Sequence, residues 1–264
     1  MARPANTDEP ERADNAMPRY DFRTPRLYIA SPLAQGGEIA LDRDQMNYLV
    51  NVLRLKRGDG VLLFNGRDGE WQAALTGEGR KSAAVMVGAR TRPQPQAGDL
   101  ELLFAPLKHA RLDYLVQKAV EMGVSRLRPV LTRHTQVARV NLERMRANVI
   151  EAVQQCGVLA VPDVAEPVGF DTAVADEGRL LVFCDEDAEV KDPVAVLAAA
   201  PRGVPMAVLT GPEGGFSEDE RARLFGRANV VRLSLGPRIL RADTAAVAAL
   251  ALVQGVLGDW GGGA

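Results

Sequence analysis

Segments with strand patterns and segments with helix patterns alternate along residues 100–257, and this alternation limits the fold more than any other feature. Short apolar runs predict strands at 101–107, 126–132, 179–185, 206–210 and 230–235. Periodic apolar residues predict helices at 110–123, 141–157, 217–226 and 243–257. Strands separated by helices pair in parallel, and the helices cover both faces of the sheet. The sequence therefore predicts an α/β domain built on a parallel sheet.

Residues 25–92 follow a different pattern, which predicts a small β-rich domain. Short alternating runs, separated by turn residues, cover 26–30, 61–76 and 82–89. One amphipathic helix is expected behind Asp42 or Asp44 as a cap, since the apolar residues after them follow helical spacing: Met46, Leu49, Val50 and Leu53. A compact barrel with one helix suggests an RNA-binding module.

Two polar segments separate or precede these domains. Residues 1–24 contain too few apolar side chains to offset the entropy of ordering, so we expect a disordered tail. Residues 93–99 contain proline and glycine without apolar periodicity, which is typical of a linker. The domain after the linker then covers residues 100–264.

Composition excludes several classes of protein. With two cysteines and two histidines in 264 residues, the chain has neither a disulfide framework nor a zinc-binding cluster, and we expect no metal. The N-terminus lacks the apolar run of a signal peptide, and no apolar stretch reaches the roughly 18 residues of a membrane span. The sequence therefore indicates a cytoplasmic protein with no membrane contact.

Charge is distributed unevenly, although the formal net charge is only -2. Residues 26–97 hold about 10 basic and about 7 acidic residues, and the six arginines between Arg126 and Arg146 are opposed locally only by Glu143. Such stretches are typical of a surface that binds an anionic partner, and they are equally typical of ordinary solvent-exposed helix and loop faces.

A glycine-rich loop follows the strand that is expected to end at Leu209. Gly211, Gly214 and Gly215 allow a ligand to approach the backbone closely, and Ser217 and Glu220 have the spacing of a helix-capping box. Ligands of α/β proteins bind at such loops, at the carboxyl edge of the sheet. The loop matches neither a dinucleotide-binding fingerprint nor a phosphate-binding P-loop, and a plain strand-to-helix turn is the alternative.

A second Gly-Pro turn, Gly236-Pro237, follows the strand at 230–235. Arg238 and Arg241 come directly after it, and a helix rich in alanine follows. If the two strands are neighbours in the sheet, the two loops lie side by side and can share a ligand. The small residues of the last helix allow close packing, either on the sheet or against another subunit.

The two Gly-Pro motifs resemble the signature of the bacterial 16S rRNA (uracil-N3) methyltransferases of the SPOUT class. The matching segments are Leu209-Thr210-Gly211-Pro212-Glu213-Gly214-Gly215, Leu235-Gly236-Pro237-Arg238-Ile239-Leu240-Arg241 and Asp243-Thr244-Ala245. Arg26-Leu27-Tyr28 and Lys118-Ala119-Val120-Glu121-Met122-Gly123-Val124 extend the resemblance over nearly the whole chain after residue 25. The chain departs from the family in Asp243, which replaces a glutamate, and in Val158, which replaces an arginine.

This resemblance implies an N-terminal PUA-like β-barrel and a C-terminal SPOUT-type α/β domain that ties a deep trefoil knot. It implies methylation of N3 of a uridine in 16S rRNA of the small ribosomal subunit, usually numbered 1498, with S-adenosyl-L-methionine as methyl donor. SPOUT relatives also lead us to expect a homodimer.

The cofactor is expected at the two loops and the start of the last helix, on Leu209, Thr210, Gly211, Pro212, Glu213, Gly214, Gly215, Leu233, Leu235, Gly236, Arg238, Ile239, Leu240, Thr244 and Ala245. Because uridine N3 reacts only after it loses its proton, the site needs positive groups, for which Arg241 and Arg238 are the candidates. Asp243 is a weaker candidate for a base, and it equally fits the N-cap of the last helix.

RNA contacts are expected from two basic groups: Arg26, Arg54, Lys56 and Arg57 in the first domain, and Arg126, Arg128, Arg133 and Arg139 in the second. Two other functions stay open at this point, a non-catalytic RNA-binding protein of the same fold and a nucleotide-binding enzyme with an unrelated reaction. Cys156 and Cys184 are expected to pack in the interior rather than react, because neither has a histidine nearby in the sequence. Trp71 and His134 fit structural or solvated positions better than RNA contacts.

Overall fold

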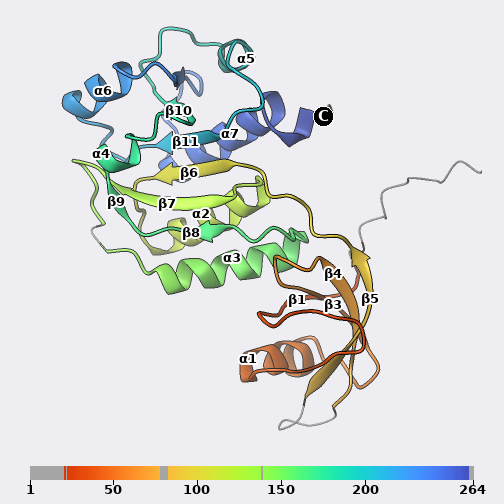
Figure 1. Cartoon of the computed structure of the whole chain (residues 1–264). Helices are drawn as coiled ribbons and strands as arrows, with labels where there is room; N and C mark the ends of the chain where they lie inside the picture. Colours follow the sequence, from red (N-terminus) through yellow and green to blue (C-terminus); the bar gives the residue numbers. More distant parts are fainter. Residues whose placement is uncertain (1–20, 22, 78–82, 138, 262–264) are drawn as a thin grey trace, which may run out of the picture.

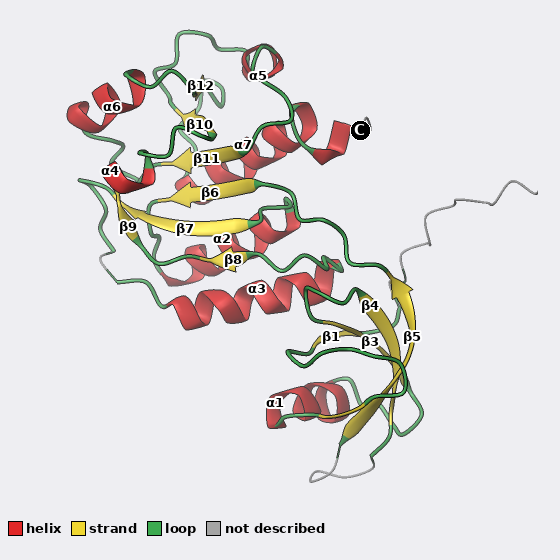
Figure 2. Cartoon of the chain, in the orientation of Figure 1, coloured by secondary structure: helices red, strands yellow, loops and turns green. Residues whose placement is uncertain are grey.

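The structure is a computed structural model that describes residue 21 and residues 23–77, 83–137 and 139–261, and it contains two separate sheets (Figures 1 and 2). Most of the tail expected at residues 1–24 lies outside the described residues. At its described end, Asp21 accepts hydrogen bonds from the backbone N–H groups of Arg23 and Thr24. These residues therefore form a turn that leads into the first strand.

The N-terminal sheet has five strands in the order β1-β3-β4-β5-β2. The strands are β1 (Arg26–Tyr28), β2 (Glu38–Ala40), β3 (Gly60–Phe64), β4 (Glu70–Leu75) and β5 (Ala84–Arg92). Only β1 and β3 pair in parallel, and register shifts between β4 and β5 bend the sheet over its own core. Its inward residues, including Leu27, Leu63 and Val85, form a separate apolar cluster. The predicted β-rich domain is thus confirmed.

The helix expected after Asp42 begins as α1 (Arg43–Met46) and continues as a π-helix, η1 (Asn47–Val52). Asp42 is the cap, because its carboxylate accepts hydrogen bonds from the N–H groups of Asp44 and Gln45. The wider π turn is closed by the Leu53 N–H, which donates to the Tyr48 carbonyl. Leu49 is the fully buried residue of this segment and anchors it to the barrel core.

The C-terminal sheet is parallel, as predicted, with the strand order β12-β10-β11-β6-β7-β8 and with β9 paired to β7. Its strands are β6 (Leu100–Phe104), β7 (Arg126–Leu131), β8 (Asp163–Val164), β9 (Val168–Gly169), β10 (Leu180–Cys184), β11 (Met206–Thr210) and β12 (Val230–Leu233). The strands that carry the two Gly-Pro loops, β11 and β12, are therefore not neighbours, because β10 lies between them.

Helices cover both faces of this sheet because its strands are apolar on both sides. They are α2 (His109–Glu121), α3 (Leu142–Cys156), α4 (Phe170–Ala173), α5 (Pro193–Ala198), α6 (Glu218–Phe225) and α7 (Ala242–Val256), followed by a short 3₁₀ turn, η2 (Asp259–Gly261). Leu102 and Val208 face one cluster with α2, α3 and α7, while Leu103 and Leu209 face another with α4 and α6. Among the described helices, none is long and apolar enough to cross a membrane.

The two sheets are joined by residues 93–99, which contain no helix or strand, and by contacts at the end of α3 (Figure 1). The Tyr28 N–H donates to the Gln154 side chain at 2.8 Å, and the Arg92 guanidinium donates to the Gly157 carbonyl at 3.1 Å. The linker enters β6 at its amino end. The N-terminal sheet therefore packs at the amino edge of the larger sheet, away from the carboxyl edge where ligands of α/β folds bind.

Candidate functional site

A cavity of about 860 Å³ opens at the carboxyl edge of the large sheet, between the segments that follow β10, β11 and β12. Most residues expected to bind the cofactor line it: Thr210, Gly211, Pro212, Glu213, Gly214, Gly215, Leu233, Leu235, Gly236, Arg238, Ile239, Leu240 and Ala245. The two Gly-Pro loops therefore share one cavity even though β10 separates their strands. The segment after β10 completes the wall between them, with Cys184, Asp185, Glu186 and Lys191.

Three expected site residues do not line this cavity. Leu209 is fully buried in the core under α6, and Thr244 is exposed on α7. Asp243 accepts a hydrogen bond from the Thr244 N–H in the first turn of α7. The residue at the N-cap of α7 is Arg241, so the alternative role of Asp243 as N-cap is wrong.

The glycine-rich loop is shaped by the packing of Phe216 and by the helix that follows. A Cβ on Gly211 would stand 2.6 Å from the Phe216 ring, so no larger residue fits there without moving that ring. Phe216 is held in turn by Phe183, with ring centroids 5.2 Å apart. Ser217 and Glu220 form the predicted capping box of α6, and Gly215 has a φ of +69° that favours glycine. The loop is therefore fixed at both ends and leaves its backbone open to the cavity.

The second loop is more exposed and carries two of the positive charges that line the cavity. Gly236 has a φ of +94°, which turns the chain sharply after β12. Beyond it, Arg238 and Arg241 are exposed, and the Ile239 side chain is 100% accessible. Arg238 and Arg241 both border the cavity, as expected from the sequence.

Residues from two other elements hold the glycine-rich loop from outside. Arg111 of α2 forms an ion pair with Glu213, and the His134 ring Nδ1 lies 3.1 Å from the Gly215 carbonyl oxygen. The Arg133 N–H donates to the Glu220 carboxylate at 2.8 Å. His134 thus contacts the site, which the sequence analysis did not anticipate. A Cβ on Gly214 would meet the His134 Cβ at 3.3 Å, so a side chain at Gly214 would press on His134.

Asp185 is a buried charge beside the cavity that sequence reasoning missed. Its carboxylate has no exposed surface and accepts hydrogen bonds from Arg221 at 2.8 Å and Arg232 at 2.7 Å. These arginines belong to α6 and β12, while Asp185 directly follows β10. The pairs therefore tie together the elements that precede or follow each loop. No motif signals this cluster in the sequence, because its three members lie far apart along the chain.

Neither cysteine has the environment of a nucleophile. Burial, together with the neighbouring carboxylates of Asp185 and Glu186, raises the pKa of the Cys184 thiol to about 12. Burial and the charge of Glu121 also raise the pKa of Cys156. Both thiols stay protonated at neutral pH, and a thiol is a much weaker nucleophile than a thiolate.

The arginines expected to bind RNA fall into two groups. The prediction that Arg26 contacts RNA is wrong, because Arg26 is only 6% exposed and its guanidinium pairs with the buried Glu70. Arg126 and Arg128 pair with Asp163 and Glu101 along β7, away from the cavity. The other residues expected to bind RNA, Arg54, Lys56, Arg57, Arg133 and Arg139, are exposed and form no ion pair with the described part of the chain. Of these, Arg133 and Arg139 follow β7 at the carboxyl edge.

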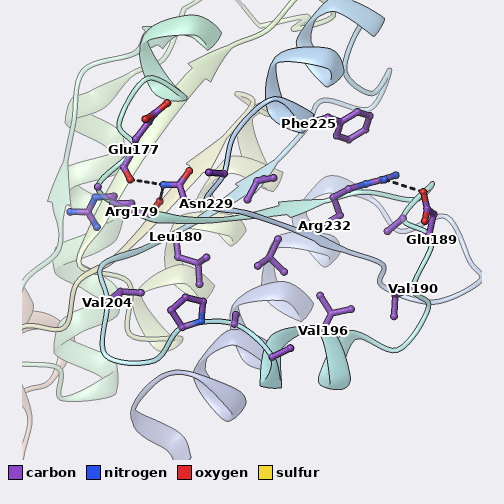
Figure 3. A pocket seen from close by; sticks show the side chains of 18 residues that line it. Glu177, Arg179, Leu180, Glu189, Val190, Val196, Val204, Phe225, Asn229 and Arg232 are labelled. Atoms are coloured by element: carbon purple, nitrogen blue, oxygen red, sulfur yellow. Dashed lines mark hydrogen bonds and ion pairs between the residues drawn. The ribbon is translucent and has the colours of Figure 1, made fainter.

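A second cavity, of about 760 Å³, lies around the start of β10 and β12 (Figure 3). Apolar side chains such as Leu180 and Val196 line much of it. Arg232 extends across it toward Glu189, with 3.9 Å between Nη1 and Oε1. The Asn229 amide donates to the backbone carbonyl of Glu177 at 2.6 Å, which closes one end of the cavity. This cavity shares Arg232 with the Asp185 cluster and contains neither Gly-Pro loop.

Comparisons with known proteins agree with this geometry. An RNA methyltransferase domain matches residues 93–254, and an RNA methyltransferase PUA domain matches residues 41–86. A relative in Rickettsia conorii, ribosomal RNA small subunit methyltransferase E, is 32% identical over 87% of this chain and 94% of its own length. The enzyme of the same name from Neisseria gonorrhoeae, solved with S-adenosyl methionine bound, is 28% identical with a TM-score of 0.78, over 89% of this chain and 98% of that one. The chain therefore belongs to the RNA methyltransferase family with an N-terminal PUA domain.

Proposed function

We propose that this protein methylates N3 of a uridine in 16S rRNA of the small ribosomal subunit, the uridine usually numbered 1498, with S-adenosyl-L-methionine as the methyl donor. The observation that carries the proposal is the meeting of two Gly-Pro loops around one cavity at the carboxyl edge of the sheet. Relatives that match nearly the whole chain are named for this class of activity.

The residues around the cavity fit this cofactor. Backbone groups of the glycine-rich loop are open to a bound nucleoside, and apolar side chains such as Leu233, Leu235 and Leu240 suit an adenine ring. The loop lacks the adjacent Lys-Ser or Lys-Thr pair with which a P-loop ends and binds phosphates, and the proposed cofactor carries no phosphate. The described residues contain no group of three side chains that could hold a metal ion. When bound, the cofactor supplies an electrophilic methyl group.

The protein's own part in this reaction is positioning and charge stabilisation. Methyl transfer is an in-line displacement, so the cavity must align the donor and the base. We assign the stabilisation of the deprotonated uridine ring to Arg241, with Arg238 beside it, because both guanidinium groups border the cavity and are exposed. Asp243 remains a weaker candidate for a base, since it lies in the next turn outside the cavity wall.

RNA binding is assigned to both parts of the chain. Residues 25–92 bind RNA through Arg54, Lys56 and Arg57, and residues 93–99 connect the two domains. Residues 100–264 bind the cofactor and contribute Arg133 and Arg139 to RNA binding. The exposure of these side chains supports the assignment. Arg126 and Arg128 have a weaker claim, because each already pairs with a carboxylate.

The assembly belongs to the same proposal. We infer a cytoplasmic homodimer whose C-terminal domain ties a trefoil knot. Ala245 and Ala248 of α7 are only partly buried, and such small side chains suit close packing against a second helix. Sedimentation at micromolar concentration should give a mass of two chains, and a single-chain mass would contradict the dimer.

The function is tested by mapping N3-methyluridine in 16S rRNA from cells with and without the gene. The modification should disappear on deletion and return with the wild-type gene but not with Arg241→Ala. Calorimetry with the purified protein should show binding of S-adenosylmethionine. Retention of the modification in the deleted strain, or no cofactor binding at millimolar concentration, would contradict the proposal.

A further inference from the structure

Three carboxylates of the described residues line the cofactor cavity, and two of them are already neutralised. Asp185 binds Arg221 and Arg232, and Glu213 forms an ion pair with Arg111. Glu186 makes no ion pair within the part of the chain that the structure describes. It is therefore the lining carboxylate whose negative charge is free to act on a ligand.

Glu186 lies close to the glycine-rich loop. Its Oε1 atom is 3.9 Å from the point where a Cβ on Gly215 would stand. The Lys191 ammonium donates to the Glu186 backbone carbonyl at 3.1 Å, which closes the segment after β10 into a turn and leaves the carboxylate outside that bond. The carboxylate is exposed and thus accessible from the cavity.

The other unpaired charges around the cavity are positive: Lys191, Arg238 and Arg241. They suit the anionic uridine and its phosphates, but they repel a cationic cofactor. S-adenosylmethionine carries a sulfonium charge, and a sulfonium has no N–H to donate, so its recognition depends on charge rather than on hydrogen bonds. A free carboxylate in the same cavity offsets that repulsion.

We propose that Glu186 is a specificity-determining residue that recognises the positive sulfonium of the cofactor and so favours S-adenosylmethionine over its product. This inference rests on the proposed function. Transfer moves the methyl group from sulfur to the uridine nitrogen, the S–C electron pair returns to sulfur, and the product S-adenosylhomocysteine is a neutral thioether. The product therefore loses the attraction to Glu186, and its release is favoured.

The test compares the binding of three ligands by calorimetry: S-adenosylmethionine, S-adenosylhomocysteine and sinefungin, in which an amine provides the positive charge. Glu186→Gln should weaken the binding of S-adenosylmethionine and sinefungin about three- to tenfold, as expected for the loss of one partly screened charge. The binding of S-adenosylhomocysteine should weaken much less. Glu189→Gln is the matched control, because it makes the same change on the same segment but borders the other cavity (Figure 3). Its ligand preference should equal that of the wild type.

The salt dependence of the preference is a second measurement. Salt screens the attraction to Glu186 and also the repulsion from Lys191, Arg238 and Arg241. Between about 0.05 M and about 0.5 M salt, the preference for S-adenosylmethionine over S-adenosylhomocysteine should therefore fall in the wild type relative to its change in Glu186→Gln, because only the wild type has the attraction to lose. Equal losses for all three ligands in Glu186→Gln would overturn the inference and assign Glu186 to a part that the ligands share, such as the ribose. A preference for S-adenosylmethionine over S-adenosylhomocysteine that is the same in Glu186→Gln and in the wild type would also overturn the inference. If the wild type binds none of the three ligands, the proposed function itself fails.

Discussion

At the scale of single residues, Gly236 is the turn residue on which the second loop depends. Its φ of +94° is unfavourable for any residue with a Cβ, although no atom lies within 4 Å of the place that a Cβ would take. Gly236→Ala should therefore destabilise this loop conformation by about 1–2 kcal/mol through backbone strain alone. Because the cofactor binds this conformation, the affinity for S-adenosylmethionine should fall about 5- to 30-fold. Calorimetry measures this affinity. Gly255→Ala in α7, which also has open space but no positive φ, is the control and should bind normally.

The sequence analysis identified residues whose signal is local and missed those whose partners are distant. Glycine and proline reveal both loops, since the conformations they allow depend on the residue itself. Glu186 and Asp185 follow β10 without such a mark. Local charge counting also failed for Arg26, Arg126 and Arg128, because Glu70, Asp163 and Glu101 reach them only in the folded chain.

At the scale of elements, Glu70 joins β1, β4 and β5 through a buried charge cluster. Its carboxylate lies 3.0 Å from the Arg26 Nε and 2.6 Å from an Arg92 nitrogen. Burial alone would raise the pKa of Glu70, but hydrogen bonds and charge from Arg92, with help from Thr91 and Arg26, outweigh it and hold the pKa below its ordinary value of 4.5. The stabilisation is therefore complete above that pH and is lost as pH falls towards the lowered pKa.

Glu70→Gln should lower the free energy of unfolding at pH 7 by about 3–5 kcal/mol, because it removes the buried negative charge that pairs with the Arg26 and Arg92 guanidinium groups. The difference from the wild type should shrink below pH 4.5, where the wild type loses the same interaction. Urea unfolding followed by tryptophan fluorescence measures both. Glu166→Gln removes an exposed ion pair with Arg146 and should cost less than about 1 kcal/mol. Equal costs for the two variants would contradict this account.

Long periodic elements were predictable, and short ones were not. The main helices and strands were expected within a few residues, whereas β2, β8, β9, α4 and α5 were missed. Each of these has six residues or fewer, which is too short for apolar periodicity to show. The π-helical turn of η1 was missed for a different reason, since its apolar spacing is the same as that of an α-helix over so few residues.

At the scale of the whole molecule, exposed arginines at the carboxyl edge should contribute more to RNA affinity than ion-paired arginines elsewhere on the same domain. Arg133 has no ion pair in the described part of the chain and lies beside the glycine-rich loop, while Arg126 pairs with Asp163. Arg133→Ala should reduce the slope of log affinity against log salt by about 0.7–0.9, and Arg126→Ala should change it much less. Filter binding over a salt series measures the slopes. A larger change for Arg126→Ala would reverse the assignment.

The order of strands in the large sheet could not be predicted from the sequence, because β10 lies between β11 and β12 only through long-range pairing. The same is true of the position of the N-terminal sheet. It packs where the linker enters β6 and where α3 ends, so the N-terminal module that carries Lys56 and Arg57 lies on the amino side of the large sheet, while the cavity lies at the carboxyl edge. One chain therefore presents the two parts that we propose to bind RNA on opposite sides of the large sheet. In a homodimer, the module of one subunit can serve the cavity of the other.

This arrangement predicts complementation between two inactive variants. Arg241→Ala removes the proposed catalytic charge and keeps the N-terminal module, whereas the double variant Lys56→Ala and Arg57→Ala keeps the cavity and weakens the module. Random pairing gives about half mixed dimers, and each mixed dimer has one intact cavity facing one intact module, so about a quarter of wild-type methylation should return. Co-expression followed by a methylation assay on 16S rRNA measures the recovery. Each variant alone should stay inactive, and no recovery in the mixture would show that the module and the cavity act within one chain.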